Sequence, residues 1–265
     1  MASTEAPKTP LALPAEIALR ASMPRPFEQL DAVVTPEGLL ELRRRGDKDF
    51  MILIGGRVLM TSNITTSERV LAQKGCQAIA GTVKPNILIG GLGLGFTLES
   101  ALQAMPSDAT VVVAELNEKV IDWCRGPVAA VNGGAALDER VRLIVADVTK
   151  EIARVAAAAS EPRYDAILWD LYVGPTRNGG DRDPLYGDAS LKKTCAALRV
   201  GGVFGVWCET PSPGFEHRLN KHGLTPELVR TKGGGLHHAV YLATKRPPRS
   251  ERAPITSGSE GRKGV

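Results

Sequence analysis

The sequence is poor in the residues that build disulfide frameworks, metal centres and aromatic surfaces. Its 265 residues include four cysteines and four histidines, and aromatic side chains make up only 5% of it. Cys76, Cys124, Cys195 and Cys208 show no CxxC spacing, which is typical of reduced thiols and not of disulfides or zinc ligands. The sequence therefore predicts no metal site.

Long apolar runs are also missing. No run approaches the roughly 20 residues that a membrane helix needs. Residues 1–26 lack the basic segment followed by an apolar core that marks a secretory signal. With 43% hydrophobic and 23% charged residues, the composition is that of an ordinary globular protein. We therefore expect a cytoplasmic protein that does not bind a membrane.

The excess of positive charge is confined to one end of the chain. The formal net charge is +4, and residues 245–265 hold six Lys or Arg against two Glu, so the rest of the chain is neutral. A neutral body gives no electrostatic footprint for DNA or RNA, and no NPPY-like tetrapeptide follows the fourth predicted strand of the main sheet. We expect a small-molecule acceptor and no nucleic acid, and a homodimer is left open.

The sequence divides into four parts. Residues 1–26 contain five prolines and are predicted to be disordered. Residues 27–75 form a small N-terminal β region, in which glycine breaks predict a hairpin or meander within residues 39–63. Residues 76–244 are predicted to form the main catalytic domain, and 245–265 a disordered basic tail.

Apolar runs alternate with helical stretches from residue 86 onward. Runs without polar alternation are typical of parallel strands buried on both faces. The pattern predicts an α/β fold with a Rossmann-like, doubly wound, mostly parallel seven-stranded sheet. The predicted strands are Ile87–Ile89, Thr110–Ala114, Val141–Ala146, Ala166–Trp169, Val203–Trp207 and a final antiparallel Ala239–Ala243; the predicted helices are Phe96–Ala104, Glu118–Arg125, Thr149–Ala158 and Ala189–Leu198.

A glycine-rich turn joins the first of these strands to its helix. In ILIGGLGLGF, Gly91, Gly93 and Gly95 lack a Cβ, which would let the backbone approach a ligand at the carboxyl end of the strand. Glu115 ends the next strand, 20 residues after Gly95, and its carboxylate can accept hydrogen bonds from both ribose hydroxyls. These residues predict a nucleoside site, with a simple tight corner as the alternative.

A further acid indicates which nucleoside is bound. Compared with the dinucleotide fingerprint GxGxxG, the third glycine comes one residue early and Phe96 stands in its place, which argues against NAD. Asp147 follows the third strand, where it could hold an adenine amino group or act only as a helix N-cap. Together with Glu115, it favours an adenosyl-sulfonium ligand: S-adenosylmethionine or its decarboxylated form.

These segments resemble the spermidine synthase family of polyamine aminopropyltransferases over about residues 37–210. GGRVLMTSNITTSE is similar to the family's entry hairpin, ILIGGLGLGFTLES to its glycine motif, and YDAILWDLYVGP to its catalytic strand and loop. The resemblance implies the fold of class I S-adenosylmethionine-dependent methyltransferases. It also implies that Glu115 and Asp147 hold ribose and adenine and that Asp170 is the base.

The chain departs from this family at the groups that bind amines. The family's amine-gripping Asp falls on Gly93, its Tyr-Gln pair on Leu71 and Ala72, and its second loop Asp on Val173. An ammonium buried without partners costs several kcal/mol. We therefore rank methyl transfer to a small amine or hydroxyl first, and aminopropyl or 3-amino-3-carboxypropyl transfer second. A sensor that binds the adenosyl ligand without catalysis is a third hypothesis.

The acceptor pocket is predicted around the end of the fourth main-sheet strand. Asp170 would act there as the catalytic base, or merely cap the following turn. His237 and His238 open the last strand, with one expected to face the core and one the solvent. Further candidates are Tyr172 as a catalytic residue, Tyr186, Glu209 and Asn63 as acceptor contacts, and Glu68 beside Asn63; core packing is an equal alternative for both tyrosines.

Overall fold

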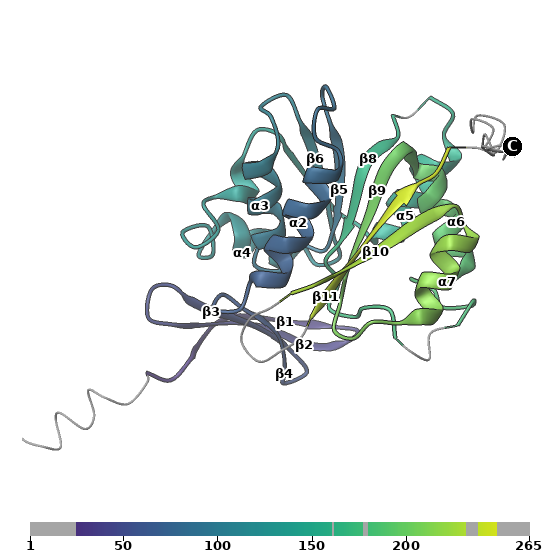
Figure 1. The fold of residues 1–265 in the computed structure, drawn as a ribbon. Helices are drawn as coiled ribbons and strands as arrows, with labels where there is room; N and C mark the ends of the chain where they lie inside the picture. The colour runs from purple at the N-terminus through teal and green to yellow at the C-terminus, as the bar shows by residue number, and fades with distance from the viewer. Residues whose placement is uncertain (1–24, 161, 177–179, 232–237, 248–265) are drawn as a thin grey trace, which may run out of the picture.

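The fold of the chain was obtained as a computed structural model, which describes residues 25–160, 162–176, 180–231 and 238–247. It contains a seven-stranded sheet in the order β10-β11-β9-β8-β5-β6-β7 and a four-stranded sheet in the order β1-β2-β3-β4. Helices cover both faces of the larger sheet, and the smaller sheet lies across one of its ends (Figure 1). The predicted doubly wound, seven-stranded α/β fold is confirmed.

The small sheet is an antiparallel meander. Its strands are β1 (Glu28–Thr35), β2 (Gly38–Arg45), β3 (Asp49–Ile54) and β4 (Arg57–Thr61). Gly55 and Gly56 join the last two strands with φ of 53° and 79°, a left-handed pair that tight hairpin turns require and glycine supplies without strain. The predicted meander is therefore correct, but it begins eleven residues earlier than expected, at Glu28 and not at residue 39.

The central strands of the large sheet are parallel, and β11 runs antiparallel to both β9 and β10. Its strands are β5 (Asn86–Gly90), β6 (Thr110–Glu115), β7 (Val141–Val145), β8 (Tyr164–Trp169), β9 (Leu198–Cys208), β10 (Leu224–Arg230) and β11 (Ala239–Lys245). Only β10 was not predicted, because its Thr-Pro-Glu sequence is typical of a helix start. Pro226 is tolerated there because β10 is an edge strand.

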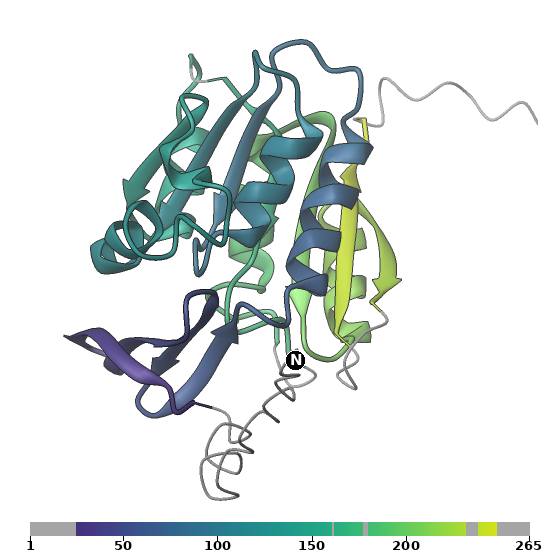
Figure 2. The same ribbon diagram turned by 90° about the vertical axis from the view of Figure 1, so that its left-hand side faces the viewer.

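Four of the helices were predicted to within a residue: α3 (Phe96–Ala104), α4 (Glu118–Arg125), α5 (Val148–Ala157) and α6 (Asp188–Ala197). Two were missed: α2 (Thr66–Ala78) and α7 (Pro213–Lys221). α2, α3 and α4 cover one face of the large sheet, and α5, α6 and α7 cover the other (Figure 1). Figure 2 shows α2 and α3 side by side in front of the strands.

Gly75 explains why α2 was missed. Glycine within a helix lowers its intrinsic stability by about 1 kcal/mol relative to alanine. In the structure a Cβ at Gly75 would lie 2.4 Å from Leu168 Cδ2, so glycine lets α2 pack closely on β8. The predicted boundary between residues 75 and 76 falls inside this helix. We propose that the boundary between the small N-terminal sheet and the main domain lies just before Thr66, where α2 begins.

Five aromatic side chains form one cluster on one face of the large sheet. Trp169, the last residue of β8, makes edge-to-face contacts with Tyr186 and Phe204 at centroid distances of 5.5 and 5.2 Å. Phe215 and Tyr241 extend this cluster, and all five side chains are buried. Edge-to-face pairs add about 0.5–1.5 kcal/mol each beyond the area that they bury. The cluster therefore holds the carboxyl end of β8 in place, immediately before Asp170.

Some of the predicted features lie outside the described residues. These are residues 1–24 and 248–265 of the two predicted disordered segments, His237, and residues 177–179 of the loop after β8. Within the ranges that the structure describes, no helix combines the length and the apolar character needed to cross a bilayer.

Candidate active site

Four neighbouring strands deliver the predicted site residues to one edge of the sheet. Asp170 follows β8, Gly91 follows β5, Glu115 ends β6, and Asp147 comes two residues after β7. Asp170 N donates to the carbonyl of the last β5 residue, and Gly91 N to a β6 carbonyl, both at 2.9 Å. The backbone hydrogen bonds between these parallel strands thus continue into the loops that carry Asp170 and Gly91. Ligands of open α/β sheets bind at this edge, where the carboxyl ends of the strands meet.

Glu115 is fixed by backbone amides and keeps acceptor capacity. Its Oε2 accepts from Leu92 N at 2.8 Å and its Oε1 from Asn117 N at 2.9 Å. Burial raises the pKa of Glu115, and these amide hydrogen bonds oppose the rise. A carboxylate has about four acceptor positions, so each oxygen can take one more donor. The residue fits a pair of ribose hydroxyls.

The three glycines of the loop are required by the protein's own packing. Gly91, Gly93 and Gly95 have φ of 85°, 52° and 83°. A Cβ on Gly91 would lie 2.5 Å from Asp170 O, and one on Gly95 would lie 2.6 Å from Asn132 Nδ2. The sequence pattern correctly indicated close approach at the end of β5. The groups that approach these glycines in the structure are protein atoms.

Asp147 is the N-cap of α5, as one of its two interpretations predicted. Its Oδ1 accepts from both Thr149 N and Thr149 Oγ1 at 2.8 Å. Both capping bonds use the same oxygen, so the cap leaves Oδ2 for another donor. Capping and a contact with an adenine amino group are therefore compatible at this residue.

Asp170 is tied to the helix that follows the glycine loop. Thr97 Oγ1, in the first turn of α3, donates to Asp170 Oδ2 at 2.6 Å. Burial raises the pKa of Asp170 to about 7, and the nearby Glu68 carboxylate adds to the rise, whereas the Thr97 bond opposes it. A group with a pKa near 7 can take up and release a proton at neutral pH.

Glu68 is a candidate site residue whose place near Asp170 the sequence did not show. It lies in the first turn of α2 and is 9% exposed. Ser67 Oγ donates to Glu68 Oε2 at 2.8 Å and also lies 3.2 Å from His238 Nδ1. Because the serine has only one proton, the histidine nitrogen must be the donor in the second bond. His238 thus helps to hold Ser67, and through it Glu68, beside Asp170.

The two α2 positions that match the family's Tyr-Gln pair lie on the buried face of the helix. Leu71 and Ala72, onto which the Tyr-Gln pair was mapped, are fully buried between α2 and the sheet. The residue of α2 that acts on Asp170 is Glu68. Its helical position could have been read only after α2 itself had been identified.

The other candidates are engaged elsewhere. Tyr186 is 1% exposed, and its hydroxyl donates to Val173 O at 2.7 Å, so it is a core residue that holds the loop after β8. Glu209 is exposed after the end of β9. Asn63 is also exposed, and its Nδ2 donates to Asp49 Oδ1 at 2.8 Å within the small sheet. These contacts favour structural roles for Tyr186 and Asn63.

Tyr172 links the loop after β8 to the small sheet. Its hydroxyl donates to Glu37 Oε2 at 2.6 Å, and the Arg57 guanidinium lies 5.7 Å from its ring centroid. Burial, with Glu37 beside it, raises the pKa of Tyr172 to about 12. Its phenol is therefore protonated at neutral pH, which makes it a donor and not a base. The contact brings the small sheet over the edge where the site residues meet.

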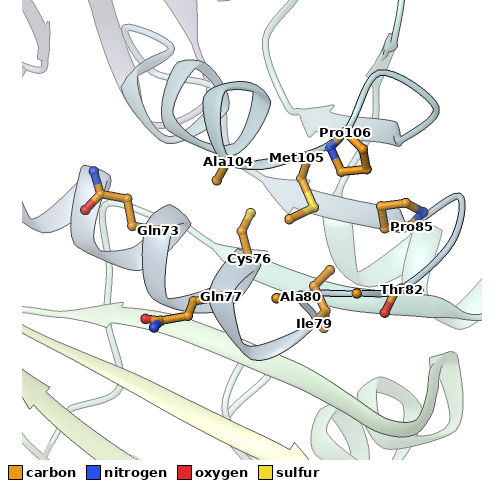
Figure 3. A pocket seen from close by; sticks show the side chains of 11 residues that line it. Gln73, Cys76, Gln77, Ile79, Ala80, Thr82, Pro85, Ala104, Met105 and Pro106 are labelled. Carbon is orange, nitrogen blue, oxygen red and sulfur yellow. The ribbon is translucent and has the colours of Figure 1, made fainter.

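A separate hollow of about 530 Å³ lies at the opposite end of α2 and α3 (Figure 3). It is lined by neutral side chains, among them Gln73, Cys76, Ile79 and Met105. It contains no acid, base or cation and does not extend the site. In the described part of the chain, no three His, Cys, Asp or Glu residues are grouped so as to hold a metal ion.

The sequence has detectable relatives. A polyamine aminopropyltransferase of Saccharolobus islandicus is 32% identical over 130 residues, which are 49% of this chain and 40% of that protein. One from a Synechococcus species is 23% identical over 183 residues, 68% of this chain and 56% of that protein. The chain thus matches about two fifths to just over half of the length of these relatives. No family model matches it.

Solved structures support the fold. Spermidine synthase from Thermotoga maritima superposes with a TM-score of 0.65 at 18% identity, over 82% of this chain and 72% of that one. A spermidine synthase in complex with the transition state analogue AdoDATO superposes with a TM-score of 0.64 at 17% identity, with the same coverage. The chain is therefore spermidine synthase-like: it resembles the polyamine aminopropyltransferases in sequence and the spermidine synthases in fold.

Proposed function

We propose that the chain is an aminopropyltransferase-type enzyme, which moves the 3-aminopropyl group of decarboxylated S-adenosylmethionine to a small amine. The observation that carries the proposal is the placing of two acids, Asp170 and Glu68, around Thr97 at the edge of the sheet next to the glycine loop: Thr97 Oγ1 lies 2.6 Å from Asp170 Oδ2 and 3.4 Å from the Glu68 carbonyl oxygen, and the Glu68 charge raises the pKa of Asp170. Two adjacent acids suit a cationic substrate, because an ammonium lowers the cost of ionising both. The relatives named above, which are polyamine aminopropyltransferases, also support this proposal.

This proposal reverses the order that the sequence suggested. Methyl transfer stood first because Gly93, Leu71, Ala72 and Val173 offer no partner for an ammonium. Glu68 supplies such a partner from α2. The curated relatives are all aminopropyltransferases, which favours the hypothesis ranked second.

The proposed site divides the donor and the acceptor between two groups of residues. Asp147, Glu115 and the glycine loop would hold adenine, ribose and the region of the sulfonium. Asp170 and Glu68 would hold the acceptor amine and orient its lone pair toward the carbon attached to sulfur. A sulfonium is already a good leaving group, so alignment and removal of one proton are the main tasks left to the protein.

The transfer step balances without a further reactant. The amine nitrogen forms a bond to the carbon next to the sulfonium, and the carbon–sulfur bond breaks with its electron pair going to sulfur. The neutral thioether 5′-methylthioadenosine leaves, and the proton lost by the amine passes to Asp170. Its pKa of about 7 suits a base that must be ionised before the step and protonated after it.

Product analysis tests the proposal. The purified chain would be incubated with a panel of diamines and with either decarboxylated S-adenosylmethionine or S-adenosylmethionine. Release of 5′-methylthioadenosine from the decarboxylated donor is the expected result. Release of S-adenosylhomocysteine from S-adenosylmethionine would instead identify a methyltransferase. Release of 5′-methylthioadenosine only from the carboxylated donor would identify aminocarboxypropyl transfer. Tight donor binding without any product would favour the sensor.

A further inference from the structure

The glycine loop uses its backbone N–H groups within the protein. The amide of Gly91 is bonded to strand β6 at 2.9 Å, and that of Gly95 closes a turn within the loop at 2.8 Å. The amide of Leu92 bonds to Glu115 at 2.8 Å, and the amide of Gly93 is close enough to the same carboxylate to lower its pKa. Strand, turn and buried carboxylate are fixed parts of the fold, so these four amides are not free for a ligand.

The remaining amide of the loop, that of Leu94, is held by a methionine side chain, which has several rotatable bonds. Leu94 N donates to Met60 Sδ at 3.1 Å. Met60 belongs to β4 of the small sheet and is partly buried. The same sulfur fills the space above Gly93, since a Cβ on that glycine would lie 2.4 Å from Met60 Sδ. Met60 Sδ therefore fills the space beside the place proposed for the sulfonium and also accepts the hydrogen bond of the Leu94 amide.

The two candidate donors differ by one carboxylate. In S-adenosylmethionine the chain on sulfur carries an ammonium and a carboxylate, and the decarboxylated form keeps only the ammonium. A carboxylate buried without a donor costs several kcal/mol. A backbone amide close to the start of a helix is a favourable partner for it, but the amide of Leu94, one residue before the N-cap of α3, is bonded to Met60. The nearby cation Arg69 is paired with Glu99 at 2.8 Å.

We propose that Met60 is the donor-specificity residue of this site. By filling the space above Gly93 and holding the Leu94 amide, its thioether excludes the carboxylate of S-adenosylmethionine and leaves the site to the decarboxylated donor. This inference rests on the proposed function, since it requires that the site binds an adenosyl sulfonium.

Calorimetry on the full chain tests this role. The dissociation constants of S-adenosylmethionine, its decarboxylated form and 5′-methylthioadenosine would be measured for the parent protein, Met60→Ala and Met51→Ala. Met51 is a partly buried methionine of β3 in the same sheet, so its variant controls for a general loosening of that sheet. The ratio of two constants on one variant is independent of the fraction that is folded.

The parent protein should bind the decarboxylated donor at least tenfold more tightly than S-adenosylmethionine. Met60→Ala should lower the ratio of the dissociation constant of S-adenosylmethionine to that of the decarboxylated donor at least tenfold, by improving the affinity for S-adenosylmethionine. Met51→Ala should leave this ratio unchanged. An unchanged ratio in Met60→Ala, equal narrowing in Met51→Ala, or equal affinities in the parent protein would each overturn the role of Met60. Failure to bind even 5′-methylthioadenosine would overturn the proposed function itself.

Discussion

Thr97 Oγ1 donates a 2.6 Å hydrogen bond to Asp170 Oδ2, and this bond joins the two halves of the proposed site. Thr97 belongs to α3, the helix that follows the glycine loop, and Asp170 follows β8, the strand that would present the acceptor. The residues are 73 positions apart in sequence. A donor bound at the glycine loop and a base on β8 are thus held in one fixed relation, which is the alignment that a transfer reaction needs.

Glu115→Ala should weaken donor binding at least tenfold. The substitution removes two charge-assisted hydrogen bonds to ribose, each worth about 1.5–3 kcal/mol. It should also destabilise the ligand-free protein by about 1–3 kcal/mol, because the amides of Leu92 and Asn117 lose their acceptor. Calorimetry with 5′-methylthioadenosine, corrected for the folded fraction, measures the first effect. Glu118→Ala, on the exposed side of α4, is the control and should change neither quantity. Unchanged affinity in Glu115→Ala would move the nucleoside site elsewhere.

Tyr186→Phe should cost stability and leave the acceptor site intact. The ring would keep its contacts with Trp169 and Phe215, and only the hydroxyl bond to Val173 O would be lost. A net loss of about 0.5–1.5 kcal/mol in the free energy of unfolding is expected, which urea denaturation can measure. The KM for the acceptor should change by less than about threefold. A tenfold rise in KM with unchanged stability would show that Tyr186 contacts the substrate.

The elements that the sequence predicted well are those with a local signal. The glycines at 91, 93 and 95, followed by a periodic helix, located α3 to the residue, and uninterrupted apolar runs located the five parallel strands. Thr66–Ala78 has no such signal, because Gly75 weakens the helical pattern for the sake of its packing on Leu168. The position of Glu68 depends on that helix and was therefore underrated.

Met60 illustrates what sequence reasoning could not reach. It is 34 residues from Leu94, on a strand of a different sheet, and neither residue is of a type that marks a site. Their contact exists only because the small sheet lies against the glycine loop. The same docking brings Glu37 to Tyr172, 135 residues away. Contacts between two sheets leave no periodic trace in either segment, whereas the ends of parallel strands can be ordered from topology alone.

Glu68→Gln should shift the pH dependence of turnover to lower pH. Asp170 acts as a base only when ionised, so kcat/KM for the amine, which reports the ligand-free protein, should fall as the pH drops through about 7. The charge of Glu68 helps to raise this pKa. Glutamine removes the charge but keeps an acceptor for Ser67 Oγ, so the acidic limb of the profile should move to lower pH. An unmoved limb would mean that the two carboxyl groups are not coupled in solution.

Asp170→Asn should abolish most turnover while the protein stays folded and binds the donor. Asparagine keeps the shape of the side chain and an oxygen for Thr97 Oγ1 but cannot take a proton, so kcat should fall by about 10²–10⁴. If Asp170 only caps the following turn, asparagine caps as well and activity should persist.

Stability against pH supplies the control for this variant. Because the native state raises the pKa of Asp170 from 3.8 to about 7, folded protein holds this proton in that pH window whereas unfolded protein releases it. The contribution of Asp170 to stability is therefore full below about pH 4 and is lost as the pH rises to about 7. Asp170→Asn carries no such charge, so its Tm at pH 8 should equal or exceed that of the parent protein. An inactive variant with a lower Tm at pH 8 would mean that activity was lost through unfolding and not through loss of the base.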